Sequence, residues 1–98
     1  MAKYGSITDL SKSNLVLFRG GGETRIQAVG SGTAIIKGVL SSGNEPVILS
    51  LVNLSTFEVV SQIKDNSIYA LDTTGLSEIS AENTGFTEIQ AELIEEAG

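Results

Sequence analysis

The feature that most constrains the fold is the close spacing of turn-forming residues along a chain rich in β-branched side chains. Val and Ile together number 17 and Thr adds 8, whereas proline occurs once. β-Branched side chains lose rotamer freedom in a helix and pack well on a pleated surface. Clusters such as Gly20-Gly21-Gly22 and Asn83-Thr84-Gly85 separate short apolar pieces. This spacing is typical of an all-β sandwich or small barrel.

We therefore predict a single small, jelly-roll-like β-sandwich of about eight short antiparallel strands. The expected strands are 14–19, 24–29, 33–40, 47–52, 57–63, 67–72, 76–82 and 87–95. In the strand expected at 87–95, Ile89, Ala91 and Leu93 alternate with polar residues. One face of this strand is therefore expected to be buried and the other exposed to solvent. A helix is the alternative there, because Glu, Gln, Ala and Leu are good helix formers, but strict alternation favours a strand.

The preceding strand repeats this alternation. Ile79 and Ala81 are flanked by Glu78, Ser80 and Glu82. We expect Ile79 and Ala81 to join Ile89, Ala91 and Leu93 in the core. We also expect strands 76–82 and 87–95 to pair through the turn at residues 83–86.

Residues 1–13 differ from the rest and are expected to form a loose N-terminal arm, with the sandwich domain at 14–98. Tyr4, Ile7 and Leu10 are spaced by three among small polar residues, with no turn signals around them. One interpretation is a loose terminus or an added strand. The sharper one is an arm that docks these three side chains on a neighbouring subunit and matters more for assembly than for folding.

Charge argues against several partners. The formal net charge is −6, and the six Lys and Arg residues are scattered. Because phosphate binding needs clustered cations, we expect neither nucleic acid nor an anionic membrane as a partner. The longest apolar run, residues 46–52, is too short to span a bilayer, and no apolar signal segment follows Met1. Synthesis in a cytoplasm is the expectation.

The residue inventory predicts that the chain is not an enzyme and uses no cofactor or metal. It has no His and no Cys, which excludes the usual nucleophile–base pairs and thiolate metal sites. No stretch fits a phosphate-binding glycine motif. Asp65, Asn66 and Asp72 supply oxygen ligands of the kind that Ca²⁺ prefers, but their spacing matches no loop motif, so calcium is the weaker alternative.

Sugar binding is the main alternative function, because sugars often stack on exposed aromatic rings. The chain has five aromatic residues and no Trp, so most of them are expected in the core. Phe86, in a turn, is the best candidate for an exposed platform, although capping the sandwich is the more ordinary role.

The order of motifs toward the C-terminus adds a family resemblance. Gly32-Thr33-Ala34-Ile35-Ile36 opens the passage, and Tyr69-Ala70-Leu71-Asp72, Gly75-Leu76 and Gly85-Phe86-Thr87 close it. In this order, residues 30–93 resemble a β-sandwich module of tailed-phage virion proteins. That family often has a Trp after the first turn, which is absent here. In these motifs Asp72 can cap a turn, Gly75 can supply a positive φ and Leu76 can plug one end of the sandwich.

The resemblance implies a non-enzymatic virion protein. Its most direct form is a capsid decoration (cement) protein that binds the outer shell and stabilises it. A carbohydrate- or receptor-binding module of a fibre or tail is the alternative. The implied partners are the major capsid protein or other virion subunits, and the implied assembly is a homotrimer. The residues expected to contact partners are Tyr4, Ile7, Leu10 and Phe86.

Overall fold

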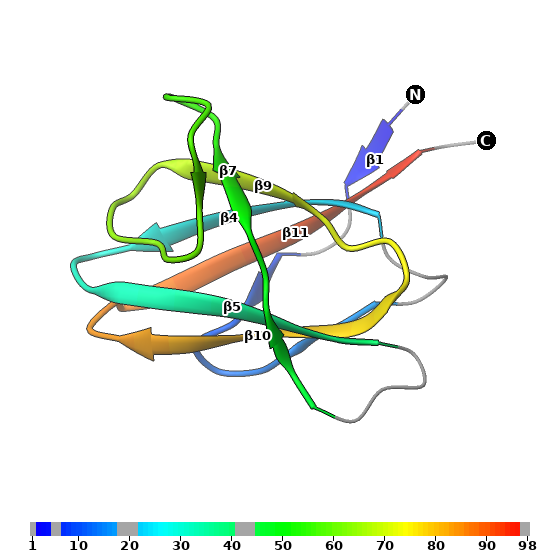
Figure 1. The fold of residues 1–98 in the computed structure, drawn as a ribbon, viewed down its shortest axis with the longest axis horizontal. Coiled ribbons are helices and arrows are strands. Elements are labelled where there is room, and N and C mark those ends of the chain that lie inside the picture. The colour runs from blue at the N-terminus through cyan, green and yellow to red at the C-terminus, as the bar shows by residue number, and fades with distance from the viewer. Residues whose placement is uncertain (1, 5–6, 18–21, 41–44, 97–98) are drawn as a thin grey trace.

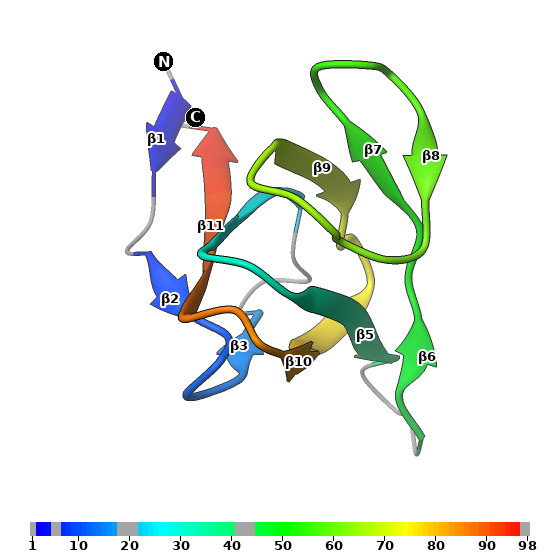
Figure 2. The same cartoon turned by 90° about the vertical axis from the view of Figure 1, so that its left-hand side faces the viewer.

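The computed structural model is all-β, as predicted, and describes residues 2–4, 7–17, 22–40 and 45–96. Its strands form two antiparallel sheets that face each other as a sandwich (Figures 1 and 2). No helix is present in these ranges. The radius of gyration is 12.6 Å, close to the value of about 13 Å expected for a compact domain of this length.

Within the described residues, the larger sheet has seven strands. They are β1 (Ala2–Tyr4), β2 (Thr8–Asp9), β4 (Glu23–Val29), β7 (Leu51–Asn53), β8 (Val59–Val60), β9 (Ile68–Asp72) and β11 (Glu88–Glu96). The order is β1-β11-β4-β9-β7-β8, and β2 also pairs with β11. The smaller sheet has the order β3-β10-β5-β6. Its strands are β3 (Leu15–Val16), β5 (Thr33–Leu40), β6 (Val47–Ile48) and β10 (Leu76–Thr84).

Alternating side chains from both sheets fill the core. Buried residues alternate with less buried ones along β4 and β5, as the period of two in a strand requires. The largest fully buried apolar side chains are Ile26, Ile36, Leu51, Ile63, Ile79 and Ile89. Three of the five predicted core positions on β10 and β11 are confirmed, because Ile79, Ile89 and Ala91 are buried. Ala81 and Leu93 are only partly buried and pack against the core.

The predicted hairpin between β10 and β11 is wrong. β10 pairs with β5 and β3, whereas β11 pairs with β4 in the other sheet. The chain crosses between the sheets at Gly85, whose φ is +100°. A second crossing, at residues 30–32, lies directly against it, because a Cβ on Gly32 would be 2.2 Å from the Thr84 carbonyl oxygen. Alternation shows which face of a strand is buried, but not which strand lies beside it.

Two other predicted strands are divided. The segment 47–52 contributes β6 to the smaller sheet and then β7 to the larger one. The segment 57–63 forms β8, and Ile63 then bridges to Ala34 of β5 in the other sheet. Both segments therefore connect the sheets on one side of the sandwich, which is on the right in Figure 2.

The N-terminal segment is joined to the larger sheet, which corrects the expectation of a loose arm. β1 pairs with β11 at Tyr4–Ile94, and β2 pairs with it at Asp9–Gln90. The Leu10 N–H donates a 2.7 Å hydrogen bond to the Ile89 carbonyl, and the Leu10 side chain is buried. In the described part of the chain, 1–13 thus adds strands to the sandwich, which was the alternative interpretation.

Candidate functional site

Two of the four residues expected to bind partners lie in the core. Leu10 is 4% exposed and Phe86 is 5% exposed. Asn83 holds Phe86 in place, because its amide nitrogen donates to the Phe86 carbonyl (2.8 Å) and its oxygen accepts from the Phe86 N–H (3.1 Å). Both side chains therefore stabilise the fold and are not available to a partner in this structure.

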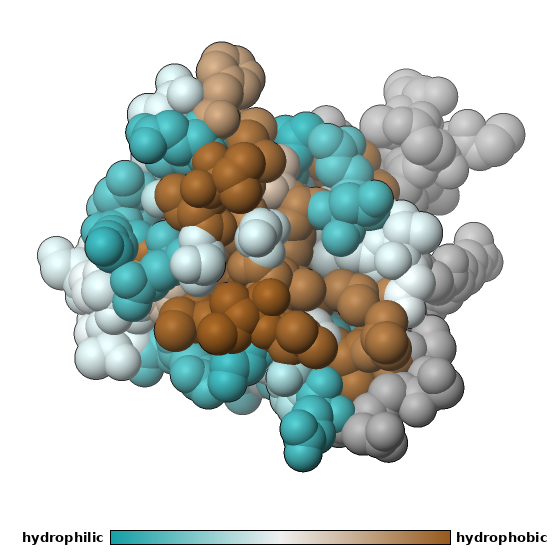
Figure 3. Space-filling view, viewed as in Figure 1, coloured by the Kyte–Doolittle hydropathy of each residue, from teal (hydrophilic) through white to brown (hydrophobic). Residues whose placement is uncertain are grey.

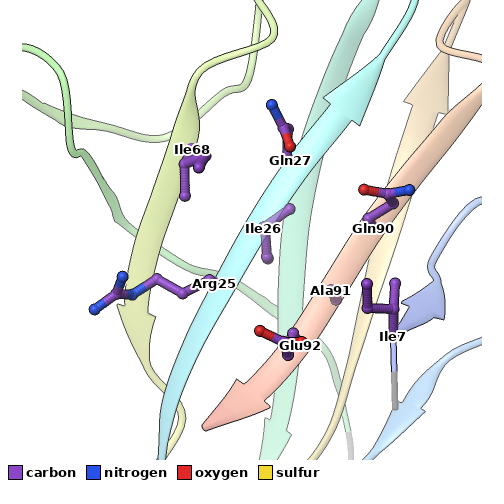
Figure 4. Close-up of a pocket in the computed structure, with 8 residues that line it drawn as sticks. All are labelled: Ile7, Arg25, Ile26, Gln27, Ile68, Gln90, Ala91 and Glu92. Atoms are coloured by element: carbon purple, nitrogen blue, oxygen red, sulfur yellow. The ribbon is translucent and has the colours of Figure 1, made fainter. Parts of the chain in front are cut away.

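The other two predicted residues lie at the β11 edge of the larger sheet. Tyr4 belongs to β1, where its backbone pairs with Ile94. Ile7 is 58% exposed and borders a shallow hollow of about 140 Å³ on the outer face of the sheet (Figure 4). Arg25, on the opposite side of this hollow, is ion-paired with Glu23 at 2.7 Å. A partner-binding role for Tyr4 and Ile7 stays a prediction.

Five of the nine large apolar side chains that are exposed in the described residues lie elsewhere, on the side where β6 and β8 form the edges of the two sheets. We call this set the apolar face; its members are Leu40 (57% exposed), Val47 (59%), Ile48 (54%), Phe57 (77%) and Val59 (69%). Figure 3 shows hydrophobic surface on this side of the molecule, both over β5–β6 and over the β7 region. Clustered apolar surface on a small domain marks an interaction site more often than scattered single residues do.

Phe57 is the most exposed large apolar residue among those described, and its backbone has a φ of +62°. It ends the tight turn from β7 to β8, where its N–H donates to the Asn53 carbonyl at 2.6 Å. Glycine is the residue that normally occupies this left-handed conformation. The structure thus holds an aromatic ring at the tip of a hairpin, in a conformation that disfavours it.

The sequence does not single out Phe57, because a chain with five aromatic residues and no Trp is expected to use most of them in the core. The available signal was the run Asn53-Leu54-Ser55-Thr56, which lies between two Val-rich pieces. Asn53 starts this turn by accepting a 2.8 Å hydrogen bond from the Ser55 N–H through its side-chain oxygen. The turn is therefore predictable from the sequence, but it does not show whether the aromatic side chain after it is exposed or buried.

The three residues considered for calcium are engaged separately. Asp65 accepts hydrogen bonds from the Tyr69 hydroxyl (2.7 Å) and the Ser67 N–H (3.0 Å). Asn66 donates to the carbonyls of residues 28 and 30, and Asp72 lies at the other end of β9. In the described ranges no group of three or more acidic side chains comes together in a way that could hold a metal ion.

Hydrogen bonds set the protonation of these groups. Those from Tyr69 and Ser67 hold the pKa of Asp65 below its ordinary 3.8, against a smaller opposing effect of burial. Burial, and then the hydrogen bond to Asp65, raise the pKa of Tyr69 to about 12. Asp72 accepts from the Thr74 hydroxyl (2.6 Å) and N–H (2.9 Å), and these bonds hold its pKa below 3.8. Asp72 therefore caps the turn before β10 as predicted, and Gly75 in that turn has a φ of +88°.

The apolar face is suited to burying surface against another macromolecule. Its five side chains are aliphatic or aromatic and supply no acid, base or nucleophile.

Of the residues described, no helical stretch has the length and apolar character needed to cross a membrane.

Comparison with known proteins finds similarity in fold only. No protein-family model matches the chain, and no curated protein sequence matches it. Two solved structures are similar. The SPBc2 prophage-derived protein YomS aligns with a TM-score of 0.75 and 18% identity, over 97% of this chain and 94% of YomS. The PBSX exported protein XepA aligns with a TM-score of 0.80 and 14% identity, over 96% of this chain but only 38% of XepA. The fold is thus that of phage-derived proteins, and in XepA it accounts for part of a longer chain.

Proposed function

We propose that this chain is a non-enzymatic structural protein of a bacteriophage and that it binds another virion subunit through the apolar face. The observation that carries the proposal is the exposure of five large apolar side chains on adjoining sheet edges. The phage-derived structural neighbours support the phage assignment, as does the resemblance to virion modules over residues 30–93. More specifically, we propose that the chain is a decoration protein that binds the outer capsid shell and stabilises it.

Burial of the apolar face supplies a driving force of the right order. Moving a large aliphatic or aromatic side chain out of water contributes about 1.5–3 kcal/mol. These five side chains are already partly covered, so each gains only part of that amount. Association costs at least about 4 kcal/mol in lost freedom of motion. The gain summed over the five side chains is therefore comparable to the lower estimate of that cost.

The test is to purify particles of a phage that encodes this chain and to measure its copy number on them by mass spectrometry. We expect the wild-type chain to stay with the particles through a density gradient. Val59→Asp and Ile48→Asp should lower its occupancy at least tenfold, because each would bury an unpaired charge at the contact. The matched control is Val16→Asp, since Val16 is 51% exposed on β3, at the other edge of the smaller sheet.

Two results would overturn the proposal. One is a chain that is abundant in infected cells but missing from purified particles. The other is a Val59→Asp or Ile48→Asp variant that binds particles as well as the Val16→Asp control. The homotrimer that the resemblance to virion modules implies is checked separately, by light scattering on the purified chain.

A carbohydrate- or receptor-binding module is the second candidate, and the exposed ring of Phe57 favours it. A sugar face would stack on the flat ring, which an aliphatic side chain of similar size does not replace. Glycan-array binding that Phe57→Leu abolishes would support this candidate. Particle binding that survives Phe57→Leu would support the structural role.

A further inference from the structure

An apolar groove lies beside the apolar face, on the outer surface of the larger sheet. It has a volume of about 460 Å³, and its lining residues include Val52 of β7, Ala70 of β9, Asp72 of β9 and Glu23 of β4. Val52 lies opposite Ala70 on one side and opposite Val59 on the other. Ala70, Val52 and Val59 therefore form a row across three strands, which connects the groove to the apolar face.

The groove has carboxylates at one end. Glu23 and Asp72 are directly opposite each other on β4 and β9, an arrangement that disfavours two like charges. Arg25 compensates Glu23 through a 2.7 Å ion pair. Two ion pairs occur in the described part of the chain, Arg25–Glu23 and Lys37–Glu82, and neither includes Asp72. Like any exposed carboxylate, Asp72 is ionised at neutral pH, and it accepts hydrogen bonds from the Thr74 hydroxyl and N–H.

An apolar floor that ends at an ionised carboxylate fits a long cationic side chain. Lys and Arg have aliphatic stems that cover apolar surface and charged heads that seek a polar end. The negative charge disfavours phosphates and other anions. A bound Ca²⁺ takes six to eight oxygen ligands, more than two carboxylates provide.

We propose that this groove receives a Lys or Arg side chain from the protein partner that covers the apolar face. The inference rests on the proposed function and specifies its partner. The partner has an apolar contact surface with a cationic side chain at one end. Its positive charge complements a chain whose net charge is −6. A second copy of this chain is a poorer fit, because it would bring the same negative charge.

A random peptide library displayed on a carrier and selected on the immobilised full chain tests this inference. We expect the enriched peptides to contain Lys or Arg flanked by Val, Ile, Leu or Phe. Synthetic copies of those peptides should bind the Asp72→Asn variant about tenfold more weakly and Asp72→Lys more weakly still. Asn keeps an oxygen that accepts the Thr74 N–H, so Asp72→Asn preserves the turn while it removes the charge.

The matched control is Glu78→Gln, which removes a carboxylate from β10 in the smaller sheet and should leave peptide binding unchanged. Glu23→Gln is the second groove variant and should weaken binding in the same direction as Asp72→Asn. Thermal unfolding of every variant checks that the sandwich is intact.

The outcomes separate the two proposals. Suppose that the peptides no longer bind Val59→Asp but bind Asp72→Asn as tightly as the wild type. The proposed Lys or Arg contact in the groove would then be wrong, while binding through the apolar face would stand. Enriched peptides that lack Lys and Arg would also contradict the proposed binding of a cationic side chain in the groove. Self-association of the chain that disappears in Asp72→Lys would assign the groove to a second copy instead. Particle binding that Val59→Asp does not weaken would contradict the proposed function itself.

Discussion

At the scale of single residues, Phe57 shows a conflict between stability and exposure. A residue with a side chain costs roughly 1–2 kcal/mol in the left-handed region, and glycine avoids that cost. The ring is 77% exposed, so it regains little of this energy by burial. A strained, exposed aromatic residue is the pattern expected where binding is retained at the expense of folding.

Replacing this residue separates the two effects. We expect Phe57→Gly to raise the free energy of unfolding by about 1 kcal/mol, because it relieves the left-handed backbone. Phe57→Ala keeps a Cβ and should leave stability within about 0.5 kcal/mol of wild type. Both variants should weaken binding through the apolar face. Urea unfolding measures the difference, and equal stability of the two variants would show that the backbone at this turn is not strained.

The hydrogen bond from Tyr69 to Asp65 can be tested by following the ionisation of the phenol. The phenol is buried and donates to Asp65, which raises its pKa to about 12. A Tyr4→Phe variant leaves Tyr69 as the sole tyrosine, so its ionisation can be followed by ultraviolet absorbance. We expect a midpoint near pH 12, shifted toward 10 by Asp65→Asn. Since the folded pKa is raised, its contribution to stability is complete below pH 10 and is lost as the pH rises toward 12. A midpoint near 10 in the native protein would contradict the buried hydrogen bond.

At the scale of elements, the N-terminal strands are held to β11 by a side chain as well as by backbone pairing. The Asp9 carboxylate accepts hydrogen bonds from the Ser11 hydroxyl (2.6 Å), the Ser11 N–H (2.9 Å) and the Ile89 N–H (3.0 Å). Burial acts to raise the pKa of Asp9, but these bonds outweigh it and hold the pKa below 3.8. The resulting stability is present above pH 3.8 and is lost as the pH falls through the lower folded pKa.

Two substitutions in the N-terminal segment should have very different effects on the free energy of unfolding. Leu10→Ala removes a buried side chain from the core and should lower the free energy of unfolding by about 2–4 kcal/mol. Ile7→Ala removes an exposed side chain and should change it by no more than about 0.5 kcal/mol. Chemical denaturation of both variants provides the comparison. Equal, small effects would instead support the loose arm that the sequence suggested.

The sequence predicted the strands better than their partners. Turn spacing and composition predicted the four long strands at 24–29, 33–40, 76–82 and 87–95, and alternation predicted the buried face of the last two, because burial of one face imposes a period of two. Pairing between distant strands leaves no such local trace. The assignment of aromatic residues failed for a related reason. Phe57 and Phe86 both follow turns in the sequence, and only their tertiary surroundings make one exposed and the other buried.

At the scale of the whole molecule, two adjacent crossings join the sheets at one end of the sandwich. The first leads from β4 to β5 and the second from β10 to β11. They are tied together by the Thr87 N–H, which donates to the Val29 carbonyl at 2.9 Å. In Figure 1 both crossings lie at the left, where the cyan and orange segments turn back. The separation of the sheets at this end depends on how closely these two backbones can approach.

Gly32 controls that approach, so its substitution should affect the whole fold. A Cβ at this position would lie 2.2 Å from the Thr84 carbonyl oxygen and 2.6 Å from the Phe86 nitrogen, both of them backbone atoms. Gly32→Ala should therefore push the crossings apart and lower the free energy of unfolding by about 2 kcal/mol or more. Gly75→Ala is the matched control. Gly75 has a φ of +88°, but a Cβ there would meet no atom within 4 Å beyond its chain neighbours, so only backbone strain of roughly 1 kcal/mol applies. Thermal and urea unfolding rank the two variants, and a Gly32→Ala protein as stable as Gly75→Ala would mean that the crossings can separate without disturbing the core.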